Sequence, residues 1–241
     1  MNKARLALGA IALLGTTTLV ATGTGTASAA PVPIVGGDYT SSAPSYIAAV
    51  GDHKGMFCSG SLVDEQWVIT ARHCKGAKTV RIGSANLNSG GTLAKVTRTV
   101  AHWDMDIRLL KLSEPVAQQP VQLGQASPTP GSDVRLYGFG QTCGPYGCGD
   151  MSPRLKQLDT KVTHDAECAG INSSRELCFD TSVGSTDCYG DSGGPAIQGG
   201  RLVGVTSRGA QGPGNSTCGK TNSIYGDVTT ATTWINRITS R

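Results

Sequence analysis

The chain has 241 residues, 38% of them hydrophobic, and its 21 basic and 17 acidic residues give a formal net charge of +4. A charge this small, without a block of like charges, gives no support for a nucleic-acid or anionic-lipid partner. No internal repeat appears, and beyond the N-terminal segment no stretch is apolar enough to span a bilayer. Composition therefore predicts a globular protein with neither a nucleic-acid nor a membrane partner.

Residues 1–29 have the features of a secretory signal peptide. Lys3 and Arg5 form a basic start, an apolar run covers 6–20, and 27–29 reads Ala-Ser-Ala, a signal peptidase site. A membrane anchor is the alternative, but the run is shorter than the roughly 20 residues of a spanning helix and no basic stop signal follows it. We expect a secreted, extracellular protein. Losing Lys3 and Arg5 lowers its net charge from +4 to +2.

The remaining part of the chain, about 210 residues, is long enough for one large domain or two small ones. Its apolar segments are short and are bounded by turn residues, which favours strands. The predicted strands are 46–50, 61–63, 67–70, 79–82, 93–100, 107–112, 133–137, 157–162, 196–197, 202–206 and 223–228. Pro and Gly interrupt the pattern at 125–132. Trp234, Ile235 and Ile238 fall at helical spacing and predict a terminal helix at 229–241. Many short strands indicate barrels or sandwiches.

An even number of cysteines in an exported chain predicts disulfides. The eight are Cys58, Cys74, Cys143, Cys148, Cys168, Cys178, Cys188 and Cys218. Spacing suggests that Cys143–Cys148 and Cys168–Cys178 close local loops, but it does not give the whole connectivity. Zinc is the alternative, yet no second close cysteine pair or His-x-His motif accompanies Cys143 and Cys148. We therefore expect four disulfides and no metal.

A glycine-rich loop surrounds one serine, since residues 190–195 read Gly-Asp-Ser-Gly-Gly-Pro. Glycines permit backbone angles closed to other residues and let a substrate approach the main chain. An ordinary tight turn would also explain them. Peptide-bond cleavage needs a nucleophile such as Ser192 together with a base and donors for the oxyanion.

His73 and Asp106 are the candidates for the base and its partner. A predicted strand leads into His73, and Cys74 follows at once, so a disulfide can pin the imidazole. Asp106 opens the apolar run 107–112, where a buried carboxylate can hold the imidazole tautomer and stabilise the imidazolium. Asp104 is the competing carboxylate, but it does not open the apolar run.

These three motifs, in the order His, Asp, Ser, resemble those of the chymotrypsin-like (trypsin-like) serine proteases. Residues 34–37, Ile-Val-Gly-Gly, resemble the family's mature N-terminus, and the likeness extends from there to the terminal helix. The signal and short leader are similar to those of secreted actinobacterial members. The resemblance implies an all-β protein with two six-stranded antiparallel barrels, at about 34–128 and 129–228, and a C-terminal helix at 229–241. The active site would lie between the barrels.

The resemblance also assigns roles to residues. His73, Asp106 and Ser192 would form the triad, and the backbone N–H groups of Gly190 and Ser192 the oxyanion hole. The pairs Cys58–Cys74, Cys168–Cys178 and Cys188–Cys218 match family disulfides, whereas Cys143–Cys148 looks peculiar to this chain or its near relatives. We expect a monomer that cuts polypeptides through an acyl-enzyme, needs no cofactor and can be bound by protein protease inhibitors.

Activation in this family uses the α-amino group of the first mature residue, which pairs with the Asp before the nucleophile. Here these are Ile34 and Asp191. A buried carboxylate without a partner is costly, so the chain should be a zymogen whose pocket forms poorly until that amine exists. Residues 30–33 would be a short propeptide. The bond to be cut follows Pro33 and not Arg or Lys, so we expect another protease to cut it.

The primary specificity pocket departs from the family pattern. Its expected residues are Thr186, Asp187, Tyr189, Ser207, Arg208, Gly209 and Ser223. Thr186 stands at the base, where trypsins carry Asp, and Asp187 follows one position later. A desolvated carboxylate favours Lys or Arg before the scissile bond. The alternative is that Asp187 is satisfied internally and that the pocket accepts apolar or polar side chains.

Three basic or polar substitutions add to this departure. Arg208 replaces the usual Trp of the rim and could favour acidic neighbours or pair with Asp187. Ser223 replaces Gly and narrows the pocket. Arg72 replaces a small residue before His73 and either disturbs its packing or extends to solvent.

A non-catalytic binding protein of the same fold is the alternative function, but it predicts a broken triad. A metal-dependent hydrolase would need a motif such as His-Glu-x-x-His, which is absent from the sequence.

Overall fold

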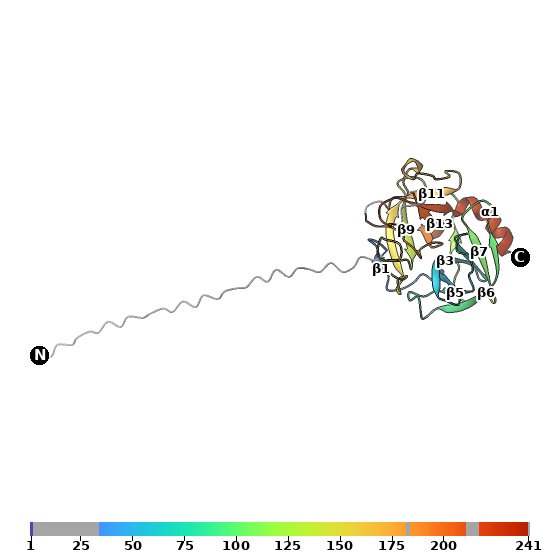
Figure 1. Cartoon of the computed structure of the whole chain (residues 1–241), viewed down its shortest axis with the longest axis horizontal. Coiled ribbons are helices and arrows are strands. Elements are labelled where there is room, and N and C mark those ends of the chain that lie inside the picture. The colour runs from blue at the N-terminus through green and yellow to red at the C-terminus, as the bar shows by residue number, and fades with distance from the viewer. Residues whose placement is uncertain (2–33, 182–183, 211–216, 241) are drawn as a thin grey trace. The chain divides into compact units, whose positions relative to one another are not determined.

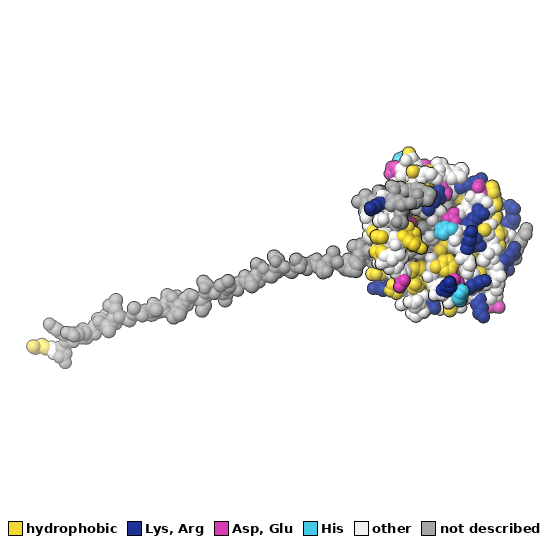
Figure 2. Space-filling view, viewed as in Figure 1, with side chains coloured by type: hydrophobic (Ala, Val, Ile, Leu, Met, Phe, Trp, Pro, Cys, Tyr) yellow, Lys and Arg dark blue, Asp and Glu magenta, His cyan; other side chains and the backbone are white. Residues whose placement is uncertain are grey.

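The structure is a computed structural model that describes Met1 and residues 34–240 except 182–183 and 211–216. The predicted signal peptide and propeptide lie outside the described residues. Figure 1 shows two groups of strands and a C-terminal helix. Each described helix is too short or too polar to cross a membrane. Figure 2 shows Lys and Arg side chains scattered among apolar and uncharged ones on the visible face, in keeping with the small net charge.

Six strands of the first half close into a barrel. They are β2 (Ile47–Gly51), β3 (Met56–Asp64), β4 (Trp67–Thr70), β5 (Thr79–Ile82), β6 (Thr92–Ala101) and β7 (Arg108–Leu112). Neighbours pair antiparallel in the order β2-β3-β4-β7-β6-β5, and β5 returns to β2. Val50, Leu62, Val68, Val80 and Leu110 are fully buried in its interior because alternate side chains of each strand point inward. The predicted first barrel is confirmed.

The other eight described strands, all of which except β1 come from the second half of the chain or its start, form a second sheet. Its strands are β1 (Asp38–Tyr39), β8 (Gln122–Leu123), β9 (Asp133–Gly138), β10 (Lys156–Lys161), β11 (Glu176–Phe179), β12 (Pro195–Gln198), β13 (Arg201–Gly209) and β14 (Ser223–Asp227). The order is β1-β10-β9-β12-β13-β14-β11, and β8 pairs parallel with β13.

This second sheet corrects the prediction of a closed six-stranded barrel. Within the described residues, the β10 side pairs with the β11 side only through the isolated bridge Val162↔Phe179, and no continuous ladder joins them. The intervening chain forms a 3₁₀ turn, η1 (Asp165–Glu167), and the Cys168–Cys178 loop instead of a continued ladder. The described strands therefore make an all-β fold with one closed barrel and one open, strongly curled sheet.

The predicted C-terminal helix is present as α1 (Val228–Thr239). Asp227 caps it by accepting a hydrogen bond from Thr229 N–H at 2.9 Å. Val228, Ala231 and Ile235 are buried in one cluster with residues of both strand systems, among them Ile107 of the β6–β7 region and Val205 of β13. The helix therefore packs across the contact between the two halves.

Candidate active site

His73 and Asp106 are oriented toward each other at the edge of the closed barrel. His73 Nδ1 lies 2.8 Å from Asp106 Oδ2, and the His73 backbone N–H donates to Asp106 Oδ1 at 3.0 Å. The Cys58–Cys74 disulfide ties the residue after His73 to β3. The His73 side chain is 48% exposed, against 23% for Asp106. With Nδ1 turned to the carboxylate, Nε2 is the ring nitrogen left to exchange a proton with a substrate or nucleophile.

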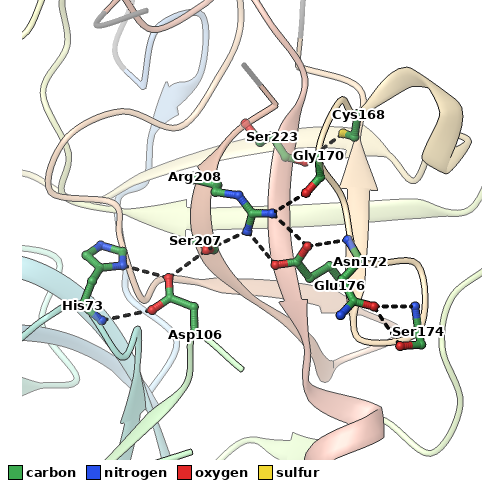
Figure 3. A network of polar contacts seen from close by, with 10 residues as sticks. All are labelled: His73, Asp106, Cys168, Gly170, Asn172, Ser174, Glu176, Ser207, Arg208 and Ser223. Atoms are coloured by element: carbon green, nitrogen blue, oxygen red, sulfur yellow. Dashed lines mark hydrogen bonds and ion pairs between the residues drawn. The ribbon is translucent and has the colours of Figure 1, made fainter. Parts of the chain in front are cut away.

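Asp106 is held in its charged form by its surroundings. Burial alone would raise the pKa of Asp106, but hydrogen bonds and charge from His73 and a hydrogen bond from Ser207 lower it below its ordinary value. Ser207 Oγ donates to Asp106 Oδ2 at 2.7 Å, as Figure 3 shows. The competing carboxylate, Asp104, pairs instead with Arg175. The structure therefore gives His73 the partner that the sequence predicted.

The loop that carries Ser192 is anchored by Asp191. The Asp191 carboxylate accepts hydrogen bonds from the N–H groups of Gly140 (2.6 Å) and Cys188 (2.8 Å). Side chains at Gly138 and Gly140 could not coexist with it, since a Cβ there would lie 1.9 and 2.2 Å from its oxygens. Burial raises the pKa of Asp191, because a charge in this cradle has lost its water.

Two groups are candidates for the positive charge that balances the Asp191 carboxylate: the Lys156 ammonium and the α-amino group that cleavage would free at Ile34. Lys156 is completely buried, its Nζ lies 3.5 Å from Gly140 O, and burial lowers its pKa. Ile34 is 1% exposed and lies in the core with Leu158. No hydrogen bond joins Ile34 to Asp191 within the described residues, so their predicted pairing stays a prediction.

Two backbone donors in this loop have no acceptor among the residues that the structure describes. The N–H groups of Asp191, Gly193 and Gly194 donate to Cys188 O, Thr206 O and Asp191 O at 2.8–2.9 Å. Among the described residues none accepts from the N–H of Gly190 or of Ser192. Gly190 has a φ of 98°, which a side chain would strain. Over the same part of the chain, no hydrogen bond joins the Ser192 hydroxyl to His73, so that contact is also a prediction.

A cavity of about 920 Å³ brings the predicted residues together. His73, Ser192 and Gly190 line it with all seven predicted pocket residues, Thr186, Asp187, Tyr189, Ser207, Arg208, Gly209 and Ser223. The Ser223 hydroxyl lies 2.8 Å from Thr181 Oγ1 and 3.2 Å from Thr186 Oγ1, so it occupies space that a glycine would leave open.

Asp187 contributes the acidic group of this cavity. Its Oδ1 is buried and has no hydrogen-bond partner within the described part of the chain. Burial raises the pKa of Asp187 above its ordinary value, against the smaller opposing effect of nearby hydroxyls, with Ser223 first. A carboxylate that is desolvated and only partly satisfied binds a cation or a proton more readily than an exposed one.

The two arginines that depart from the family pattern have partners other than Asp187. Arg208 also lies beside the triad, since its Nη1 is 3.5 Å from the Ser207 hydroxyl that donates to Asp106. Arg208 donates to Glu176 Oε1 and Oε2 at 2.5 and 2.9 Å and to Gly170 O at 3.0 Å (Figure 3). The alternative in which Arg208 pairs with Asp187 is therefore wrong, because its partner is Glu176, which the sequence did not single out. Arg72 is exposed and donates to Trp103 O at 3.3 Å, so it extends to the surface beside an undisturbed His73.

The four predicted disulfides are all present: Cys58–Cys74, Cys143–Cys148, Cys168–Cys178 and Cys188–Cys218. The Cys143–Cys148 loop also brings Tyr146 to the cavity, where its ring meets that of Tyr189 edge to face with centroids 4.7 Å apart. Sequence reasoning missed Tyr146, because an aromatic residue in a loop carries no periodicity that would place it.

Known proteins that are similar to this chain point to one family. The family model described as Trypsin matches residues 34–235. The dog protein "Serine protease 1" is 36% identical over 199 residues, which cover 73% of this chain and 79% of the dog protein. "Trypsin theta" of Drosophila erecta is 32% identical over 84% of each chain. The solved structure of neuropsin, described as a serine protease of mouse brain, superimposes with a TM-score of 0.76 at 28% identity, covering 84% of this chain and 98% of its own. The chain therefore belongs to the trypsin family and is a serine endopeptidase.

Proposed function

We propose that the protein hydrolyses peptide bonds outside the cell with Ser192 as nucleophile, His73 as general base and Asp106 as the group that orients His73. One observation carries this proposal. One cavity is lined by His73, which is bound to the Asp106 carboxylate, and by Gly190 and Ser192. Among the described residues, the N–H groups of Gly190 and Ser192 are the only ones of the 190–194 segment without an acceptor. Nucleophilic acyl transfer needs this set of groups.

The proposed reaction uses these groups in turn. Ser192 Oγ attacks the scissile carbonyl carbon and its proton passes to His73 Nε2, while the N–H groups of Gly190 and Ser192 bind the oxyanion. The C–N bond then breaks, and the leaving amine takes the proton from His73. A water molecule attacks the acyl-enzyme with His73 again as base, and release of the carboxylic acid restores Ser192. Asp106 stays ionised throughout and stabilises the imidazolium.

Single substitutions at Ser192, Asp106 and Asp104 test these roles. We expect Ser192→Ala to abolish hydrolysis above the residual background, and Asp106→Asn to lower kcat by about 10⁴-fold because the imidazole loses its correct tautomer. Asp104→Asn is the matched control, since Asp104 pairs with Arg175 instead of His73. Equal losses in the two Asp→Asn variants would contradict the assignment.

For specificity, we propose Lys or Arg before the scissile bond. Support comes from the Asp187 Oδ1 atom, which is buried in the cavity wall without a partner among the described residues. Arg208 is engaged by Glu176, which leaves Asp187 to a substrate cation. A peptide library that varies only this position tests the proposal. Cleavage after Phe or Leu as fast as after Arg would establish the apolar alternative.

For activation, we propose that cleavage after Pro33 frees the Ile34 amine, which then pairs with Asp191. The buried Ile34 side chain and the buried Asp191 carboxylate support this proposal. Signal-directed secretion, a monomeric state and recognition by protein inhibitors stay predictions of the same account. Similarity to actinobacterial members is also a prediction, resting on the signal and leader, since the relatives named above are animal proteins.

A further inference from the structure

Ser59 lies where the closed barrel meets the loop that carries Ser192. It belongs to β3, is 1% exposed, and donates from its backbone N–H to Ser192 O at 2.9 Å. A Cβ on Gly193 would lie 2.4 Å from Ser59 O, and one on Gly194 would lie 3.3 Å from Ser59 Cβ. The strand therefore packs directly against this loop.

The Ser59 hydroxyl bridges two segments of the second sheet. It donates to Gly190 O at 2.9 Å and accepts from the backbone N–H of Phe139 at 3.3 Å. Phe139 follows β9, whereas Gly190 precedes the nucleophile. A hydroxyl has one proton to donate and can accept as well, and both capacities are used here.

This bridge restrains the peptide group that lies between the two proposed oxyanion donors. The Gly190–Asp191 peptide has its C=O bound by Ser59 and its N–H bound by Cys188 O at 2.9 Å. Both ends of that peptide plane are thus fixed. Gly190 is free of side-chain restraint, so without the bridge its backbone could rotate and turn its own N–H away from the cavity.

We propose that Ser59 is a positioning residue, which holds the Gly190–Asp191 peptide so that the Gly190 N–H stays available to the oxyanion. It touches no substrate atom and acts through the loop. This inference rests on the proposed function of Gly190 as an oxyanion donor. Preorganised donors contribute to catalysis because they need no rearrangement when the charge develops.

Ser61 provides a matched control on the same strand. It lies two residues from Ser59, is fully buried, and its Oγ has no hydrogen-bond partner within the described residues. Ser61→Ala and Ser59→Ala therefore remove the same atom from the same kind of environment, but only the second breaks the bridge.

The test compares these two variants as purified, secreted enzyme with a verified N-terminus. We expect Ser59→Ala to lower kcat about tenfold with KM within about twofold, which is the size expected for one hydrogen bond. A peptide aldehyde, whose adduct places a negative oxygen in the hole, should bind Ser59→Ala about tenfold more weakly, whereas the product peptide binds equally well. Ser61→Ala should match the wild type in all three measurements.

A merely structural role would lower thermal stability without separating aldehyde from product affinity, and that result would overturn the proposal. If Ser59→Ala does not fold, Ser59→Gly, which removes the hydroxyl together with Cβ, carries the same expectations. If the wild type hydrolyses no peptide, the proposed function fails. Hydrogen exchange at the Asp191 amide then tests the positioning role without any measurement of activity. Faster exchange in Ser59→Ala than in Ser61→Ala supports this role, and equal exchange overturns it.

Discussion

Asp187 shows how one displaced carboxylate changes a pocket. Its Oδ1 is buried without a partner in the described part of the chain, and burial raises its pKa. In the empty pocket this carboxyl is protonated over a wider range of pH than an exposed one, and a substrate cation favours its ionised form.

The selectivity for Arg over a neutral side chain should therefore depend on pH. We expect the ratio of kcat/KM for Arg and Leu substrates to rise as pH increases through the raised pKa of Asp187, because only the carboxylate attracts the guanidinium. The ionisation of the catalytic base cancels in this ratio. Asp187→Asn should lower kcat/KM for Arg about 100-fold, change that for Leu little, and make the ratio independent of pH. A ratio that is flat in the wild type would show that Asp187 does not meet the substrate.

His102 is another buried titratable residue, and it supports the segment that leads to Asp106. Its Nδ1 accepts from the N–H groups of Asp104 (3.2 Å) and Met105 (3.0 Å), and its ring packs edge to face on Trp234. Burial, followed by the charges of Arg175 and Arg72, lowers the pKa of His102. A protonated Nδ1 could not accept these two hydrogen bonds.

Stability should therefore fall as pH falls. The unfolded chain binds a proton on His102 near the ordinary pKa of about 6.5, while the folded chain resists it until a lower pH, so stability is lost from about 6.5 down through the folded pKa. The unfolding free energy, measured with urea, should fall between pH 7.5 and pH 5. We expect this fall to be about 1 kcal/mol smaller in His102→Gln than in the wild type. His53→Gln, at an exposed histidine, is the control, and an equal change there would refute the role of His102.

The sequence predicts site residues best where the role of a residue depends on its immediate neighbours in the chain. The position of Asp106 at the start of an apolar strand separated it from Asp104, and the structure pairs only Asp106 with His73. The partner of Arg208 was wrong because Glu176 is 32 residues away, and such distant pairs leave no local signal. Ser59 escaped notice for a related reason: a small polar residue resembles a turn residue until its neighbours are known.

At the scale of elements, apolar periodicity found strands with large side chains and missed others. The predicted strand 61–63 is the second half of β3, whose first half contains Cys58, Ser59 and Gly60. Ser59 is buried because the nucleophile loop packs on it, whereas Cys58 and Gly60 pack inside the barrel. No period in the sequence reveals these contacts. The missed strand β11 has four residues, and β1 and β8 have two each. Their pairing is determined by tertiary contacts.

The terminal helix gives a direct test of packing between the halves. Ile235 is 1% exposed in the cluster that both strand systems share, whereas Ile238 is only partly buried at its edge. We expect Ile235→Ala to lower the unfolding free energy by about 3 kcal/mol, and Ile238→Ala by about 1 kcal/mol or less. Equal losses in chemical denaturation would show that the helix does not seal this cluster.

At the scale of the whole molecule, the closed barrel supplies His73 and Asp106, and the open sheet supplies Ser192, Asp187 and Asp191. Their relation depends on contacts that cross between the halves, such as the hydrogen bond from Ser59 N–H to Ser192 O. Activation belongs to this scale too, because a new charged amine at Ile34 would act on Asp191 across the core.

The propeptide should be removed by another protease, since Pro33 precedes the bond and a pocket that selects Lys or Arg does not accept Pro there. We expect Ser192→Ala, secreted by a host that has extracellular proteases, to begin at Ile34 like the wild type. N-terminal sequencing of both proteins checks this. A propeptide kept only by Ser192→Ala would instead show that the enzyme cuts itself.

Site mapping of a covalent label most directly tests the central claim that Ser192 is activated by His73. Intact enzyme that begins at Ile34 is treated with a fluorophosphonate and digested, and the modified residue is identified by mass spectrometry. The account predicts a single label on Ser192, coincident loss of hydrolysis, and labelling slowed by orders of magnitude in His73→Ala but not in Asp104→Asn. Unmodified Ser192 in a correctly processed enzyme, or labelling that is as fast without His73, would contradict it.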